Sequence, residues 1–117
     1  MCPGEVWEID YPQVDGREQA GQRPGLVLQD DGFAQRSPLV LTAPFSTSPG
    51  TTRFPAVLPV TMTVENGLRA DCFLLVFQLR ATDRARVRKR LGAVTPALLA
   101  QVYETLDRLT GRAGGAP

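Results

Sequence analysis

Prolines and glycines are the feature that most limits what this chain can fold into: ten prolines and eleven glycines lie among its 117 residues. Between them stand apolar runs of a few residues, a length that favours strands over helices. The pattern predicts many short elements joined by tight turns, as in a small β-barrel. The length suits one domain with one hydrophobic core.

The apolar runs predict five or six strands. The runs at 39–43 and 72–79 are apolar on both faces, so we expect them in the centre of the sheet. Pro44 is expected to end the first of these two, Pro59 indicates an edge strand, and Gly92 indicates a bulge. A single helical turn is expected at 33–36. The expected strand ranges are 4–11, 26–28, 39–43, 56–60, 72–79 and 87–94.

One long helix is expected near the C-terminus. Thr95 is suited to the N-cap, and Pro96 to the first helical position, where no backbone donor is needed. Gly111 is the expected stop, so the domain covers residues 1–111 and residues 112–117 form a flexible tail. The sum is an α+β fold, a mostly antiparallel sheet followed by one packed helix. Its apolar stripe is Leu98, Leu99, Val102, Leu106 and Leu109.

Thirteen basic and twelve acidic side chains give a net charge of +1, which argues against a protein that coats nucleic acid nonspecifically. The distribution is uneven, because residues 80–90 hold six basic residues and one acid, Asp83. This basic run is either a solvated face or the footprint of an anionic ligand. Its members are Arg80, Arg84, Arg86, Arg88, Lys89 and Arg90.

Several chemistries are excluded by composition. The chain has no histidine, which removes His-based acid–base catalysis and Ser-His-Asp triads. No cysteine or carboxylate cluster has metal-ligand spacing, and neither phosphate-binding glycine motif occurs. The two cysteines form no disulfide framework, and no signal sequence or membrane-length apolar stretch is present, so a cytoplasmic protein is expected.

A polar loop, residues 15–23, runs directly into the apolar residues 26–28. It holds Asp15, Glu18, Gln19 and Arg23, and a loop on a rigid strand is a common place for binding groups. Taken alone, such a loop is more often a hairpin turn with solvated charges. Arginine, carboxylate and hydroxyl groups of this kind suit the stabilisation of charge on a phosphate.

Specific motifs along the chain resemble the MazF/PemK (Kid) family of toxin endoribonucleases. They begin with Gly4-Glu5-Val6-Trp7 and with the stretch G-x-E-Q-x-G-x-R-P at 16–24. They continue in 44–47, 54–55 and 78–83, and end with the helix led by Thr95-Pro96. The resemblance covers nearly the whole chain in the family's order, and it favours a functional role for residues 16–24.

The resemblance implies an SH3-like, CcdB/MazF-like β-barrel that forms a homodimer and cleaves single-stranded RNA at short motifs without metal or other cofactor. In this mechanism the ribose 2′-hydroxyl attacks phosphorus, leaving a 2′,3′-cyclic phosphate and a 5′-hydroxyl. A cognate antitoxin protein is the implied partner, and no membrane is. The implied catalytic residues are Arg23, Glu18, Ser46 and Thr47. The candidate RNA-binding residues are Gln19, Gln22, Arg53, Gln78, Arg80 and Arg84.

The chain departs from the family at two positions. Serine stands at 46 where relatives carry threonine, so either Ser46 or Thr47 supplies the hydroxyl. Phe77 stands where many relatives carry an aspartate with an acid–base role, and more weight falls on Arg23. Arginine is a poor proton carrier, so its expected role is electrostatic, while Glu18 either accepts the 2′-hydroxyl proton or orients Arg23.

Two other functions remain open on the sequence. A CcdB-like toxin has the same barrel and poisons gyrase by binding it, but its C-terminal tip carries a tryptophan. Here no aromatic residue follows Tyr103. A relative that binds RNA or antitoxin without cleaving is also compatible with Phe77.

Overall fold

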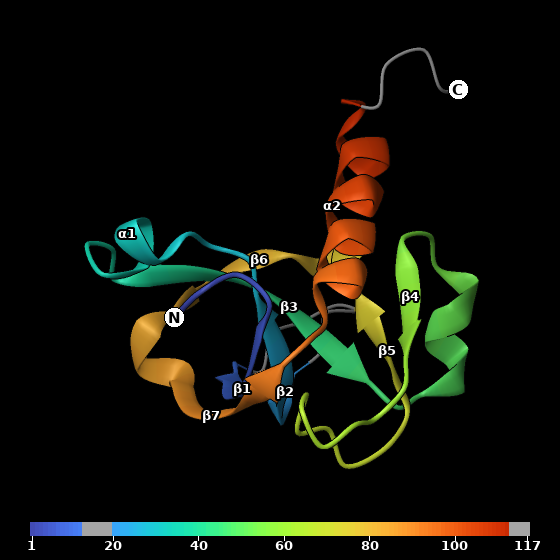
Figure 1. The fold of residues 1–117 in the computed structure, drawn as a ribbon, viewed down its shortest axis with the longest axis horizontal. Helices are drawn as coiled ribbons and strands as arrows, with labels where there is room; N and C mark the ends of the chain where they lie inside the picture. The colour runs from blue at the N-terminus through green and yellow to red at the C-terminus, as the bar shows by residue number, and fades with distance from the viewer. Residues whose placement is uncertain (13–19, 113–117) are drawn as a thin grey trace.

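The computed structural model describes residues 1–12 and 20–112, so Asp15, Glu18 and Gln19 lie outside the described residues. The elements are shown in Figure 1. In chain order they are β1 (Glu5–Tyr11), β2 (Gly21–Val27), α1 (Asp31–Ala34), β3 (Leu39–Ser46), η1 (Pro49–Arg53), β4 (Val57–Val60), β5 (Cys72–Leu75), η2 (Val76–Gln78), β6 (Arg80–Asp83), η3 (Arg84–Arg86), β7 (Val87–Ala93) and α2 (Pro96–Thr110), where η denotes a short 3₁₀ helix.

The sheet is antiparallel throughout its described pairings, and its strands follow the order β4-β5-β3-β2-β1-β7. β6 pairs with the first half of β3, which leaves the last residues of β3, Phe45 and Ser46, to pair with β5. The predicted α+β class, with a C-terminal helix, is confirmed. The predicted barrel is not closed: among the described residues, no pairing joins β4 to β7 at the two ends of this path.

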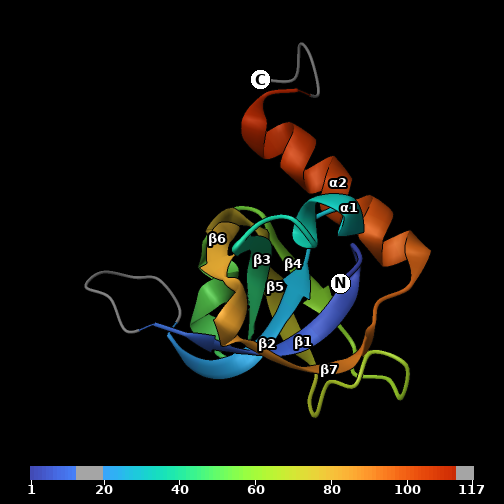
Figure 2. The same cartoon turned by 90° about the vertical axis from the view of Figure 1, so that its left-hand side faces the viewer.

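The core lies between the sheet and the first half of α2. Val6, Leu26 and Phe45 are fully buried there, and Val102 reaches them from the helix. Figures 1 and 2 agree in placing the C-terminal end of α2 away from the sheet. The predicted apolar stripe is therefore confirmed except at Leu109, which is 45% exposed because it lies beyond the surface that α2 covers.

The ends of α2 are as predicted. The Thr95 hydroxyl accepts a hydrogen bond from the Leu98 N–H at 3.1 Å, and Pro96 follows in the first turn. Gly111 caps the other end with φ of 83°, a left-handed conformation that glycine adopts without a steric penalty. No helix among the described residues is long and apolar enough to cross a membrane.

Several strand boundaries differ from the prediction. β2 begins at Gly21, which places Gln22 and Arg23 in a strand rather than in a loop. β3 continues through Pro44 to Ser46, since proline lacks only the donor and can still stand in a ladder opposite Gly25. The hydroxyl-rich segment 45–53 is ordered as the end of β3 and then η1.

The apolar run 72–79 is not one strand. It forms β5, turns through η2, and leads into β6, which the sequence did not predict. The short helix α1 also starts earlier than expected, because Asp30 caps it by accepting from the Gly32 N–H. β4 is the edge strand that Pro59 indicated. In β7, Leu91 is skipped in the pairing with β1, so the expected irregularity lies next to Gly92.

Candidate RNA-cleaving site

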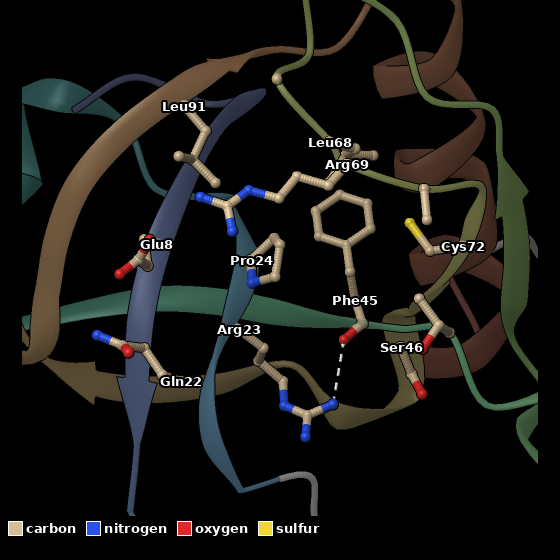
Figure 3. A pocket seen from close by; sticks show the side chains of 13 residues that line it. Glu8, Gln22, Arg23, Pro24, Phe45, Ser46, Leu68, Arg69, Cys72 and Leu91 are labelled. Atoms are coloured by element: carbon tan, nitrogen blue, oxygen red, sulfur yellow. Dashed lines mark hydrogen bonds between the residues drawn. The ribbon is translucent and has the colours of Figure 1, made fainter.

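One cleft of about 620 Å³ opens where four segments meet: the β1–β2 pair, the end of β3, the segment between β4 and β5, and β7. Figure 3 shows its side chains. Glycine contacts bring the β4–β5 segment against β7: a Cβ on Gly92 would lie 2.1 Å from the Glu65 carbonyl oxygen. The polar side chains that line the cleft are Glu8, Gln22, Arg23, Ser46, Thr47 and Arg69.

Arg23 is held at the edge of the cleft by backbone carbonyl groups. Its Nε and one terminal nitrogen donate to the Ala20 oxygen at 3.1 and 2.7 Å, and the other terminal nitrogen donates to the Phe45 oxygen at 3.5 Å. The last contact is the dashed line in Figure 3. Neutral carbonyl groups fix the position of the guanidinium, and no carboxylate of residues 1–12 or 20–112 forms an ion pair with it. With respect to these residues, the cation is available to an anionic ligand.

A second arginine and a buried tyrosine lie close enough to Arg23 to act on its charge. The Arg80 guanidinium stacks over the Tyr11 ring at 4.3 Å from its centre. Partial burial lowers the pKa of Arg23, the Arg80 charge acts in the same direction, and Tyr11 opposes both. Arginine nonetheless stays protonated in proteins, so this environment makes Arg23 a cation that gains from an added anion.

Tyr11 is not a candidate proton acceptor. Its ring is 1% exposed, and its hydroxyl lies 2.8 Å from the Thr42 hydroxyl, which in turn lies 2.8 Å from that of Thr82. Burial raises the pKa of Tyr11 to about 12, so the phenol is neutral at physiological pH. A Cβ on Gly25 would lie 2.4 Å from the Tyr11 hydroxyl, which explains why glycine stands at position 25.

Ser46 and Thr47 line the same cleft with different exposure. Ser46 is buried, 4% exposed, and its hydroxyl oxygen accepts from the Ser48 N–H at 3.1 Å. Its own proton remains available for donation, since a hydroxyl both donates and accepts. Thr47 is exposed to solvent. Both residues line the same cleft as Arg23, and the choice between their hydroxyls stays a prediction.

Of the other candidate RNA-binding residues, some lie at the cleft and others lie elsewhere on the molecule. Gln22 lines the cleft, and Arg80 does not line it but lies near enough to Arg23 to act on its charge. Arg53 is exposed on η1 with its guanidinium over the Phe54 ring, and Gln78 is half-buried in η2. Arg84 does not line the cleft, because its guanidinium donates to the Ala34 carbonyl of α1. Glu18 and Gln19 lie outside the described residues.

Phe77, which stands where many relatives carry aspartate, packs against Phe54. Their ring centres are 5.3 Å apart with an angle of 33° between the rings. Neither aromatic residue lines the cleft. No group of three or more potential metal ligands occurs in residues 1–12 and 20–112.

Of the six polar side chains named above that line the cleft, two were missed by the sequence reasoning, Glu8 and Arg69. Glu8 lies in the acidic alternation of β1, which is typical of a solvated strand face, and Arg69 follows a turn signal at 65–68. Only the packing of the β4–β5 segment over β1 and β2 brings them together.

The fold is that of a family of toxins. The model of the PemK-like, MazF-like toxin of type II toxin-antitoxin system matches residues 3–110. The chain therefore belongs to this family.

Individual relatives agree. The chain is 28% identical over 109 residues to Endoribonuclease MazF9 of Mycobacterium tuberculosis, a match that covers 91% of this chain and 92% of the relative. It is similar to the crystal structure of MazF (Form-I) from Deinococcus radiodurans, with a TM-score of 0.76, 25% identity and 94% of each chain covered. The MazE-MazF (Form-III) structure from the same organism matches with a TM-score of 0.67, 25% identity and 94% of each chain covered.

Proposed function

We propose that this protein is a toxin endoribonuclease that cuts single-stranded RNA at short sequence motifs and is inhibited by a cognate antitoxin. The observation that carries the proposal is the cleft that a carbonyl-anchored Arg23 lines together with Ser46 and Thr47. Membership of the PemK-like, MazF-like family supports it, as does the similarity to a relative named as an endoribonuclease.

The proposed reaction is an internal transfer at one phosphate. The ribose 2′-oxygen bonds to phosphorus and the bond from phosphorus to the 5′-oxygen breaks. The 2′-hydroxyl loses its proton and the 5′-oxygen gains one. The products are a 2′,3′-cyclic phosphate and a 5′-hydroxyl, and no water or redox partner is consumed.

Arg23 is assigned to the phosphate. Negative charge builds on the nonbridging oxygens as the 2′-oxygen attacks, and a fixed guanidinium fork stabilises that charge more in the transition state than in the ground state. Ser46 or Thr47 donates a hydrogen bond to the same phosphate. Glu18 is proposed to orient Arg23 rather than to accept the 2′-hydroxyl proton.

The remaining assignments follow from the same proposal. RNA contacts are assigned to Gln19, Gln22, Arg53, Gln78, Arg80 and Arg84. An antitoxin is proposed as the inhibitor because the chain is similar to MazF in the MazE-MazF structure from Deinococcus radiodurans. A homodimer is proposed from the family resemblance. Since the proposed substrate is messenger RNA, the proposed compartment is the cytoplasm.

The test is cleavage of a short single-stranded RNA by the purified protein in EDTA, followed by analysis of both new ends. We expect cleavage with no added metal, a cyclic phosphate on one product and a 5′-hydroxyl on the other. Loss of activity on chelation, restored by a divalent ion, would contradict the metal-free mechanism. A linear phosphate formed without a cyclic intermediate would indicate attack by water. No cleavage of any RNA would overturn the proposed function.

A further inference from the structure

The cleft has a second polar region, away from Arg23, formed by Glu8 and Arg69. Glu8 is half-buried on β1, and Arg69 is exposed in the segment between β4 and β5. In Figure 3 the Arg69 guanidinium extends across the cleft toward Glu8, and the Gln22 amide lies beside Glu8. In the described part of the chain, no hydrogen bond or ion pair ties these three side chains to another residue.

This region is unsuited to phosphate. The Glu8 carboxylate repels a phosphate group, whereas it accepts N–H donors of the kind that a nucleobase presents. The Arg23 end has the opposite character, with a cation and two hydroxyls. The charges therefore place phosphate at Arg23 and a base between Glu8 and Arg69.

The surfaces between these groups suit a flat ring. Pro24, Leu68 and Leu91 supply apolar walls, and Figure 3 shows Pro24 and Leu91 on either side of the Arg69 guanidinium. The cleft volume of about 620 Å³ falls in the range of sites that hold a small organic ligand. A base between these walls exposes its edge to the carboxylate and the guanidinium.

The donor and acceptor pattern selects one base. Guanine presents two neighbouring acceptors, O6 and N7, which match the guanidinium fork, and two neighbouring donors, N1–H and the N2 amine, which match a carboxylate. Adenine places the N6 donor next to N7, and the pyrimidines have no N7. No base other than guanine satisfies both side chains with paired hydrogen bonds.

We propose that Glu8 and Arg69 read a guanine next to the cleaved phosphate, Glu8 accepting from N1–H and the N2 amine and Arg69 donating to O6 and N7. This inference rests on the proposed endoribonuclease function and deepens it. Glu8 and Arg69 act here on specificity and have no part in the reaction at phosphorus.

The first experiment maps the cleavage sites of the purified protein on an RNA pool of random sequence. We expect guanine to be enriched within one nucleotide of the cut. Glu8→Gln and Arg69→Ala should each lower the preference for guanine over adenine by roughly tenfold to a hundredfold, the usual effect of losing one paired base contact, while cleavage persists. Arg88→Ala, an exposed position on β7 outside the cleft, is the matched control and should leave the preference unchanged.

The second experiment assigns each contact by atom in one RNA substrate. Inosine lacks the N2 amine, and its use should slow the wild type but have little further effect on Glu8→Gln. Replacing guanosine by 7-deazaguanosine removes N7 and should slow the wild type but not Arg69→Ala. If Arg69→Ala does not fold, Arg69→Lys keeps the charge and loses the fork, and we expect the same relaxed preference.

The outcomes separate the inference from the proposed function. Cleavage without guanine enrichment overturns the inference and leaves the proposed function standing, whereas no cleavage of any RNA overturns the proposed function. Variants that weaken antitoxin binding but keep the base preference show that Glu8 and Arg69 contact protein, which also overturns the inference.

Discussion

At the scale of single residues, Arg23 illustrates how a charge is kept available. A surface arginine that pairs with a carboxylate gains little and loses much of its attraction for other anions. Among the described residues, Arg23 pairs with no carboxylate and donates instead to the carbonyl oxygens of Ala20 and Phe45. Its planar fork is thereby oriented before any ligand arrives, which is the condition for efficient electrostatic stabilisation of a transition state.

This setting predicts that replacing Arg23 abolishes cleavage without unfolding the protein. Arg23→Ala should lose RNA cleavage, and Arg23→Lys should be severely impaired because one ammonium cannot reproduce the planar fork. Single-turnover cleavage of a short RNA measures the effect, and thermal unfolding verifies the fold. Near-normal turnover by Arg23→Lys would refute the argument from fork geometry.

The hydroxyl groups of Ser46, the last residue of β3, and of Thr47, which follows it, give a second prediction. Removing a donor that acts on the transition state costs about 2.7–4 kcal/mol, or roughly a hundredfold to a thousandfold in rate. We expect that loss for Ser46→Ala and a mild effect for Thr47→Ala, measured by single-turnover cleavage.

Ser46 also accepts from the Ser48 N–H, so its loss has a structural component. Ser46→Thr keeps the hydroxyl and should restore most of the rate, which distinguishes catalysis from support of the loop. A large effect at Thr47 with little at Ser46 would move the phosphate contact by one residue.

At the scale of elements, α2 depends on its first residues for stability. The Thr95 hydroxyl satisfies the Leu98 N–H, one of the backbone donors that a helix leaves without a partner at its start. Thr95→Ala should lower the free energy of unfolding by about 1 kcal/mol, measured by urea denaturation. Thr95→Ser retains the cap and should stay close to wild type. Equal losses in both variants would mean that the methyl group, rather than the hydroxyl, stabilises this end.

The same helix shows which elements a sequence can predict. Thr95, Pro96 and Gly111 are local signals, and each acts on backbone groups of its own helix, so both ends were predicted. The split of 72–79 into β5 and η2 followed by β6 was not, because β3 pairs with both strands at different points along its length. That choice depends on partners far away in the sequence.

The residues of the site can also be separated into those that the sequence predicts and those that it does not. Arg23 and Ser46 stand in specific motifs and were predicted, and the structure brings both to one cleft. Glu8 and Arg69 carry no local signal, since an acid in a strand and an arginine after a turn are ordinary surface residues. Their meeting requires the β4–β5 segment to pack beside β7, which the close contacts of Gly67 and Gly92 permit.

At the scale of the whole molecule, the net charge is small, but the charged side chains are unevenly distributed. Thirteen basic and twelve acidic side chains nearly cancel. Part of the basic run is paired, because Arg86 lies 3.9 Å from the Asp10 carboxylate and Arg90 lies 3.3 Å from that of Glu5. Arg88 and Lys89 remain on the exposed surface of β7, outside the cleft.

This distribution predicts that RNA affinity depends weakly on salt. A single-stranded nucleic acid contributes a slope of about −0.7 in log K against log salt for each neutralised phosphate, so one phosphate at each of Arg23, Arg53, Arg80 and Arg84 gives about −2.8. Fluorescence anisotropy with a 2′-fluoro RNA, which lacks the nucleophile, measures binding without cleavage. Arg23→Ala should make the slope less negative by about 0.7, the contribution of one phosphate. The double variant Arg88→Ala/Lys89→Ala should leave it unchanged, because neither residue lines the cleft. A slope several times steeper, lost in the double variant, would mean that β7 holds the RNA backbone and that the cleft is not the main binding surface.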